Sequence, residues 1–358
     1  MEKQVLFFGA CHYSGLMKLG RWWIQRSGPR LIILNYHRAS GGNLRDHMLY
    51  LRRHYRLMHL KEALEELYTP CEARKQMRDR RTRLVLTFDD GYRDNYTHAY
   101  ALARELQVPI TIFLIPGYIE SGKCFWWLEG DRLVRYAQVG EATIEGHTYQ
   151  LRQRGDRKAL VQAIYTRACN ARSVAEREAF LEIVREILAV PSIATSGGEP
   201  VLNWTEVREM EESGWVSFGA HTMHHPVLGY LMDPQEVQRE VGDCRNVLEQ
   251  QLDYSIRLFA YPLGRSEHFG EEGLRAVREA GYEWAVTTIY GINTPQSDPL
   301  QLHRIICDVK WHWLLMAADI SGLRKFFSPL FSYGRVLLPV GKGMVSLPLR
   351  LLKSEYQQ

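Results

Sequence analysis

Two adjacent carboxylates, Asp89 and Asp90, stand where an apolar run ends in a glycine turn. Residues 87–92 read Thr-Phe-Asp-Asp-Gly-Tyr and follow the apolar residues 84–86. Such a run predicts a buried strand that breaks into a tight turn, and α/β proteins place their chemistry at that end of the sheet. Neighbouring acids there could divide the work, one binding a metal ion and one acting as a base. Asp-Asp-Gly is also ordinary turn chemistry, so this motif does not decide alone.

A histidine cluster further along the chain could complete a metal site. Residues 221–226 read His-Thr-Met-His-His-Pro. The four-residue spacing of His221 and His225 puts both imidazoles on one side of a helical turn, which is a usual arrangement for zinc. The glutamate of the H-E-x-x-H motif, which is the general base of metalloproteases, is absent. A metalloprotease of that kind is therefore excluded. His224 is offset by one residue and is expected to point elsewhere. Two imidazoles and one carboxylate would leave a position open for water, as in catalytic sites.

Alternating strands and helices must position these groups. Apolar strands are predicted at 31–36, 84–88, 110–114, 215–219, 257–261, 284–288 and 302–306, with helices between most of them. About seven such units with short links predict a parallel sheet that closes, or nearly closes, into a barrel. Residues 124–198 interrupt the pattern: Trp126 and Trp127 are expected to precede a helix, a strand-like piece spans 142–151, and two helices follow. We interpret them as an insertion on the rim of the barrel.

Charge is distributed unevenly along the chain. The net charge is +4, of which residues 1–30 carry +4 and residues 323–358 carry +5, so residues 31–322 are left with −5. An acidic middle argues against nucleic acid as a ligand. Both ends mix cations with apolar residues, which suits peripheral contact with an anionic membrane surface or packing on the domain. We therefore divide the chain into an N-terminal extension (1–30), a catalytic domain (31–322) and a basic, apolar C-terminal tail (323–358).

Cysteine usage and apolar runs bear on location. The six cysteines are scattered without a C-x-x-C pair, which indicates free thiols in a reducing compartment. The first residues are too polar for a secretory signal peptide, and no apolar run reaches about 18 residues, so no transmembrane helix is predicted. The expected location is the cytoplasm, with peripheral contact at the inner face of the membrane as the variant suggested by the termini.

Taken together, the two motifs resemble the polysaccharide deacetylases of carbohydrate esterase family 4. The resemblance covers about residues 31–306, and residues 124–198 are the least similar part. It implies a distorted (β/α)7 barrel, here with a helical insertion and basic apolar terminal extensions. It also implies that Asp89 is the general base and that Asp90, His221 and His225 hold a divalent metal, usually zinc.

The general acid follows a less common pattern. Members of the family typically carry an Arg-x-Pro-Tyr motif whose Arg steadies the base, but residues 259–264 read Phe-Ala-Tyr-Pro-Leu-Gly. The chain looks like the exopolysaccharide-deacetylase subgroup with rearranged motifs, whose first strand ends in Tyr-His with that His as the acid. Tyr36-His37 matches. His303 in the last strand is the alternative, and we favour His37. The group that steadies Asp89 is left open.

These observations predict a hydrolase that removes an N-acetyl group from an amino sugar of a polysaccharide or of a lipid-linked glycan precursor. Two alternatives stay open: an amidase acting on a non-sugar C–N bond, and an inactive barrel that binds glycan or serves as a scaffold. The presence of all four base and metal residues argues against the inactive barrel. Tyr92, Trp126 and Trp127 either stack on sugar rings or pack internally.

Overall fold

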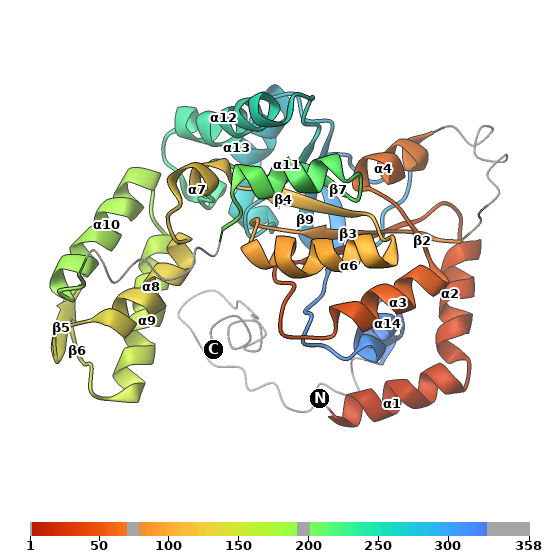
Figure 1. The fold of residues 1–358 in the computed structure, drawn as a ribbon, viewed down its shortest axis with the longest axis horizontal. Helices are drawn as coiled ribbons and strands as arrows, with labels where there is room; N and C mark the ends of the chain where they lie inside the picture. The colour runs from red at the N-terminus through yellow and green to blue at the C-terminus, as the bar shows by residue number, and fades with distance from the viewer. Residues whose placement is uncertain (1, 70–78, 80, 192–200, 328–358) are drawn as a thin grey trace.

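Seven parallel strands close into a barrel in the computed structural model (Figure 1). The structure describes residues 2–69, 79, 81–191 and 201–327. Around the ring, β3 pairs back with β1, and a short strand β2 (Arg56–Leu57) adds to β3. This closure confirms the predicted (β/α)7 barrel. The strands in order are β1 (Leu31–Tyr36), β10 (Leu302–Ile306), β9 (Trp284–Tyr290), β8 (Leu258–Ala260), β7 (Val216–Ala220), β4 (Ile110–Leu114) and β3 (Arg83–Phe88).

The interior of the barrel is apolar at one end and polar at the other. Inward side chains near the amino ends of the strands, such as Leu31, Val85 and Leu302, cluster with the apolar face of α4 (Leu60–Tyr68), which closes that end. Because strand side chains alternate with a period of two, Asn35 continues the inward series of β1 and is fully buried. The polar carboxyl end of the barrel is therefore where chemistry can take place.

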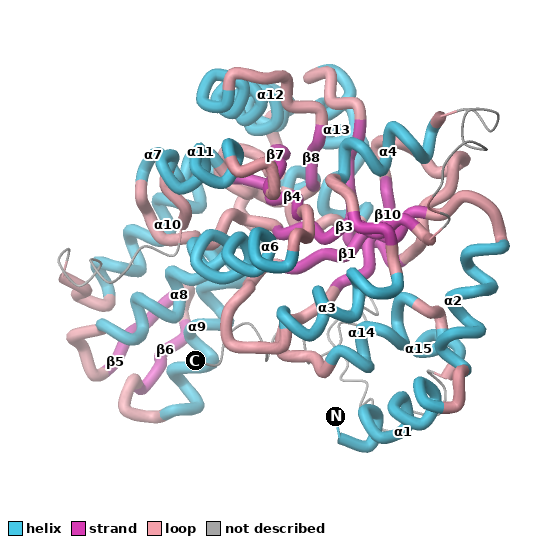
Figure 2. The backbone as a smooth tube through the Cα atoms, turned by 45° about the vertical axis from the view of Figure 1, so that its right-hand side comes forward, coloured by secondary structure: helices cyan, strands magenta, loops and turns pink. Residues whose placement is uncertain are grey.

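Helices cover the outside of the barrel (Figures 1 and 2). In α12 (Pro234–Leu252) the apolar residues at 237, 241, 244, 248 and 252 form one face that is buried. Helix α11 (Trp204–Glu212) begins after Asn203, whose side chain caps it in a reciprocal capping box with Glu206. The outer elements are α3 (Leu44–His54), π-helix η1 (Asn95–Tyr100), α6 (Ala101–Leu106), α7 (Pro116–Ser121), α11 (Trp204–Glu212), η3 (Leu228–Tyr230), α12 (Pro234–Leu252), α13 (Ser266–Glu279) and α14 (Trp313–Ile320).

The insertion forms a helical layer on one side of the barrel (Figure 1). The strand-like piece at 142–151 is an antiparallel hairpin, because Glu145 and Gly146 both take positive φ angles, of 50° and 80°, and turn the chain. The tryptophan pair begins α8 rather than preceding it. The insertion consists of α8 (Trp126–Tyr136), β5 (Glu141–Ile144), β6 (His147–Gln150), α9 (Arg154–Cys169) and α10 (Val174–Ile187).

The N-terminal extension is a pair of helices, α1 (Glu2–Tyr13) and α2 (Leu16–Arg26), on the side of the molecule away from the insertion (Figures 1 and 2). Of the predicted tail, α15 (Leu323–Phe326) is described, whereas residues 328–358 lie outside the described residues. Among the described helices, none has the length and apolar character needed to cross a membrane. The five described cysteines are free thiols, as predicted.

Candidate active site

Asp89 is held by an arginine from the far end of the chain. The Nη1 and Nη2 atoms of Arg304 donate to the two carboxylate oxygens of Asp89 at 2.7 Å each, and Asn35 donates to Oδ2 at 3.1 Å. Arg304 also donates from Nε to the carbonyl of Thr287. Arg304 is 0% exposed and Asp89 is 2% exposed, so this is a buried bidentate ion pair. It supplies the arginine that the sequence motif lacked.

The charge of Arg304 decides the ionisation of Asp89. Burial alone raises the pKa of this carboxyl, but the Arg304 guanidinium, with smaller contributions from His221 and His37, holds the pKa well below its usual range. Asp89 is therefore a carboxylate with a fixed orientation. Arg304 occupies one side of the Asp89 carboxylate. Asp89 can therefore accept a proton only through the lone pairs that Arg304 leaves open.

Asp90 lies against the two histidines of the cluster. Its Oδ1 atom is 3.4 Å from His221 Nε2 and 3.6 Å from His225 Nε2, and one ligand atom from each of the three residues lies within 4.8 Å of the others. Two atoms that each lie about 2.1 Å from a tetrahedral ion are separated by roughly 3.4 Å. The three side chains thus have the spacing of ligands around one ion.

Local backbone strain sets up this arrangement. Asp90, Thr222 and His225 have positive φ angles of 74°, 64° and 53°, a region that non-glycine residues seldom adopt. The hydroxyl of Thr222 accepts a bond from the His225 backbone N–H at 2.9 Å, so Thr222 orients the histidine loop. Strained residues of this kind collect at functional sites, where the surrounding structure holds them in place.

Hydrogen bonding and burial prepare the two histidines as metal ligands. The Nδ1 atom of His221 lies 2.6 Å from the carbonyl of Ala260, which makes Nδ1 the N–H donor and leaves Nε2 for a metal. Burial, assisted by His221, lowers the pKa of His225 to about 3, so this imidazole is uncharged. Oδ1 of Asp90 is buried without a hydrogen-bond partner. An unsatisfied carboxylate oxygen beside two imidazole nitrogens fits a divalent cation.

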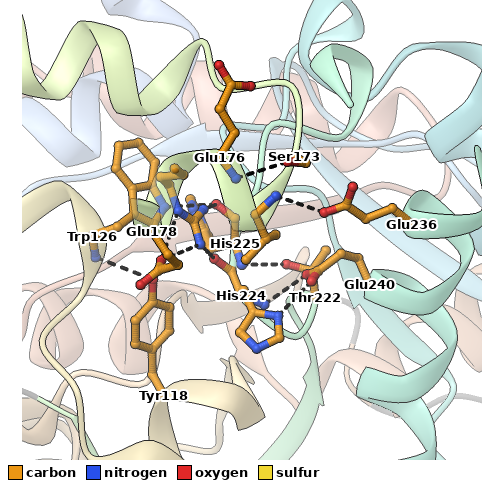
Figure 3. A network of polar contacts seen from close by, with 12 residues as sticks. Tyr118, Trp126, Ser173, Glu176, Glu178, Thr222, His224, His225, Glu236 and Glu240 are labelled. Carbon is orange, nitrogen blue, oxygen red and sulfur yellow. Dashed lines mark hydrogen bonds and ion pairs between the residues drawn. The ribbon is translucent and has the colours of Figure 1, made fainter. Parts of the chain in front are cut away.

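The insertion contributes directly to the histidine loop (Figure 3). From α8, Trp126 Nε1 donates to the carbonyl of His225 at 3.0 Å. From α10, Arg177 donates to the carbonyls of His224 and His225, at 3.1 and 3.5 Å, and stacks over the Trp126 ring. On the other side, the His224 ring contacts Glu240 of α12 at 2.6 Å, which fits the expectation that His224 points away from the metal ligands. Helices of the insertion and of the barrel thus hold the histidine loop from two sides.

The two candidate acids lie in different places. His37 follows β1 directly at its carboxyl end and lies near enough to Asp89 and Asp90 to contribute to lowering the pKa of both carboxyls, which burial alone would raise. His303 lies on the opposite face of β10 from Arg304, and its ring packs so closely on Gly291 that a Cβ there would lie 2.3 Å from Nδ1. The β1–β10 register puts His303 level with Ile32, about 16 Å along the strand from His37. The structure brings His37 to the site and leaves His303 outside it.

Of the aromatic residues singled out in the sequence, Trp127 borders the histidines. Its ring centre is 4.5 Å from that of His225, and its Nε1 atom donates to the hydroxyl of Tyr92 at 2.7 Å. Tyr92 and Trp126 are buried and pack internally, and Arg38 covers the Tyr92 ring. Trp127 is the one of the three that is only partly buried.

Arg304 and Arg177 are the functional residues that the sequence did not reveal. A signal for Arg304 was present, because a charged residue at an inward position of the apolar run 302–306 needs a buried partner. Arg177 gave no comparable signal, since it lies in a helix rich in charged residues.

A closed parallel barrel with a fixed carboxylate beside an Asp-His-His group has the architecture of a hydrolytic enzyme. A family model described as polysaccharide deacetylase matches residues 76–198 and 192–285. The chain belongs to the polysaccharide deacetylase family, carbohydrate esterase family 4, and is an enzyme of the deacetylase class. This confirms the resemblance on which the site residues were assigned.

Relatives extend over most of the chain. It is 25% identical over 289 residues to the Bacillus subtilis (strain 168) protein named "Putative polysaccharide deacetylase YxkH", covering 79% of this chain and 74% of that protein. The structure of IcaB from Ammonifex degensii aligns with a TM-score of 0.53 at 18% identity, over 82% of this chain and 98% of the other. That of the Streptococcus pyogenes deacetylase PplD in complex with acetate has a TM-score of 0.50 at 18% identity, over 78% and 93%. These two structures show a shared fold.

Proposed function

We propose that the protein is a metal-dependent de-N-acetylase that acts on an amino sugar in a polysaccharide or in its lipid-linked precursor. The observation that carries this proposal is the adjacency of two differently held carboxylates. Asp89 is fixed and charged by Arg304, whereas Asp90 faces His221 and His225 with an unsatisfied oxygen. Family membership supplies the class of reaction.

The proposed metal ligands are Asp90, His221 and His225, and two imidazoles with one carboxylate favour Zn²⁺. A divalent ion bound there would polarise the acetamide carbonyl and acidify a water molecule. Asp89 accepts the proton of the attacking water, and Arg304 keeps this carboxylate ionised and correctly turned. His37 donates a proton to the departing amine nitrogen, so that the C–N bond breaks to give acetate and the free amino sugar.

Metal analysis tests the ligand assignment. Protein purified without chelator should contain about one divalent metal ion per chain, and His221→Ala or His225→Ala should abolish it. His224→Ala is the matched control, because this neighbour bonds Glu240 and lies outside the proposed ligand set. Full metal content in the His221 and His225 variants would refute the assignment.

Acetate release tests the reaction and its substrate. N-acetylated glycans, both polymeric and lipid-linked, should release acetate with the wild-type protein. Asp89→Asn should keep its metal and lose turnover, because it removes the proton acceptor without touching a ligand. A metal-loaded protein that releases acetate from no sugar, but cleaves other amides, would replace the glycan by a non-sugar substrate.

A further inference from the structure

The second helix of the chain carries three large apolar side chains on its outer face. In α2, Leu19, Trp22 and Trp23 are 57%, 47% and 69% exposed. With Arg26 they occupy positions i, i+3, i+4 and i+7 and therefore form one stripe. The opposite face carries Met17, which is fully buried, and Gly20. A surface helix normally has the reverse arrangement, so the stripe requires an explanation.

The contacts of α2 prevent it from turning the stripe inward. A Cβ atom on Gly20 would lie 2.7 Å from the carbonyl oxygen of Ser321, so only glycine allows this close approach after α14. Arg21 donates to the hydroxyl of Tyr50 at 2.6 Å, and the Tyr50 ring stacks on Trp313. The inner face is thus tied to α3 and α14, and the tryptophans are held outward.

The first helix adds a second exposed stripe beside cations. In α1, Leu6 and Tyr13 are 76% and 85% exposed and lie seven residues apart, with Ala10 between them on the same face. Lys3, Lys18 and Arg26 are exposed along the two helices, whose only acid is Glu2. We call the outer face formed by Lys3, Leu6, Ala10, Tyr13, Lys18, Leu19, Trp22, Trp23 and Arg26 the hairpin face.

We propose that the hairpin face binds the surface of an anionic lipid bilayer. Tryptophan beside basic residues is the composition of segments that lie in a membrane interface, where the ring enters the headgroup region and the cation meets a phosphate. The cation–π contact of Arg26 over Trp22, at 4.7 Å, already joins the two kinds of group. This binding would hold the barrel against the membrane surface.

Charge favours a membrane over two other possible partners of the hairpin face, namely a second copy of the protein and residues 328–358 of the same chain. A second copy would bring two hairpin faces together, each from a segment with a net charge of +4, and like charges repel. Residues 328–358 carry Arg335, Lys342, Arg350 and Lys353 against the single acid Glu355, so this segment is also cationic. An anionic surface attracts both segments. Each Lys or Arg near that surface raises the membrane partition coefficient about fivefold.

Vesicle sedimentation of the full-length protein tests the proposal. Wild type should sediment with vesicles of phosphatidylcholine containing 30% phosphatidylglycerol, more weakly as salt is raised, and remain in solution with pure phosphatidylcholine. Trp22→Ala/Trp23→Ala should lower partition at least tenfold, and Lys18→Gln/Arg26→Gln should lower it about 25-fold. Ile183→Ala/Met232→Ala removes exposed apolar groups elsewhere and should bind as wild type does.

Three results would overturn the proposal. One is a folded wild-type protein that stays in solution with the anionic vesicles, and another is equal binding by wild type and both hairpin variants, which would assign the binding to another segment. The third is a dimer, seen by analytical ultracentrifugation, that the tryptophan variant dissociates while vesicle binding is unaffected. Acetate release from a soluble substrate should be unchanged in the hairpin variants, so failure here leaves the proposed function untouched.

Discussion

Replacing Arg304 by methionine should expose how strongly the barrel depends on its buried ion pair. Methionine keeps a long unbranched side chain but removes the charge and both 2.7 Å bonds to Asp89. Because both partners are buried, loss of one leaves an uncompensated charge, which costs about 3–5 kcal/mol of the free energy of unfolding. Asp89→Asn should cost a similar amount, since it leaves the guanidinium without its counter-charge.

A double-mutant cycle separates this pair from its surroundings. Once either charge is gone, removing the other relieves the imbalance, so Asp89→Asn/Arg304→Met should be about 2–3 kcal/mol more stable than the sum of the single variants predicts. The measurement is denaturant unfolding followed by circular dichroism, in chelator so that metal binding does not contribute. Single effects that add to the double effect within about 0.5 kcal/mol would refute the reasoning.

Enzymatic activity provides an independent test of the Asp89–Arg304 ion pair. Arg304→Met should retain its metal, because Arg304 contacts none of the proposed ligands, but turnover should fall about 100-fold or more. Without the guanidinium, burial raises the pKa of Asp89, and the carboxyl loses two of the bonds that fix its orientation. Arg304→Lys restores a charge without the planar fork, so it should recover stability better than turnover. Wild-type turnover in Arg304→Met would show that Asp89 needs no such partner.

Three further experiments test the general acid, the support of the histidine loop and a second ion-pair cluster. His37→Ala should lose far more acetate release than His303→Ala, and the opposite order would exchange their roles. Arg177→Met should weaken metal affinity about tenfold or more, measured by competition with a chelating dye. Unchanged affinity would show that the contacts from the insertion do not affect metal binding. Burial raises the pKa of Glu66, but bonds from Arg83 and Arg56 outweigh it and hold the pKa below its usual range. The ionised Glu66 therefore stabilises the fold above about pH 4.3, and this stabilisation is lost as the pH falls through the lower pKa of the folded state. The free energy of unfolding of Glu66→Gln should accordingly vary less between about pH 5 and 3 than that of wild type.

Local sequence patterns predicted the strands and the two motifs because each is encoded by neighbouring residues. The strands at Ile110–Leu114 and Leu302–Ile306 have the predicted bounds, and the Asp-His-His group is brought together by the carboxyl ends of β3 and β7. The partner of Asp89 could not be predicted in this way. Arg304 is 215 residues away in the sequence, and its recognition requires the closure that makes β1 the neighbour of both β3 and β10. The sequence therefore predicts which groups react better than it predicts what holds them.

The insertion belongs to the site, although it is the part of the chain least similar to the family pattern. His225 and Thr222 occupy strained left-handed conformations, each at a cost of about 1–3 kcal/mol. Such conformations persist only when surrounding contacts over-determine them, and the barrel supplies one set through Glu240 and the Thr222 hydroxyl. The other set comes from Trp126 and Arg177, whose bonds go to backbone carbonyls and therefore fix the path of the loop. Changes in the insertion can thus alter how firmly the metal ligands are held while the ligands themselves stay the same.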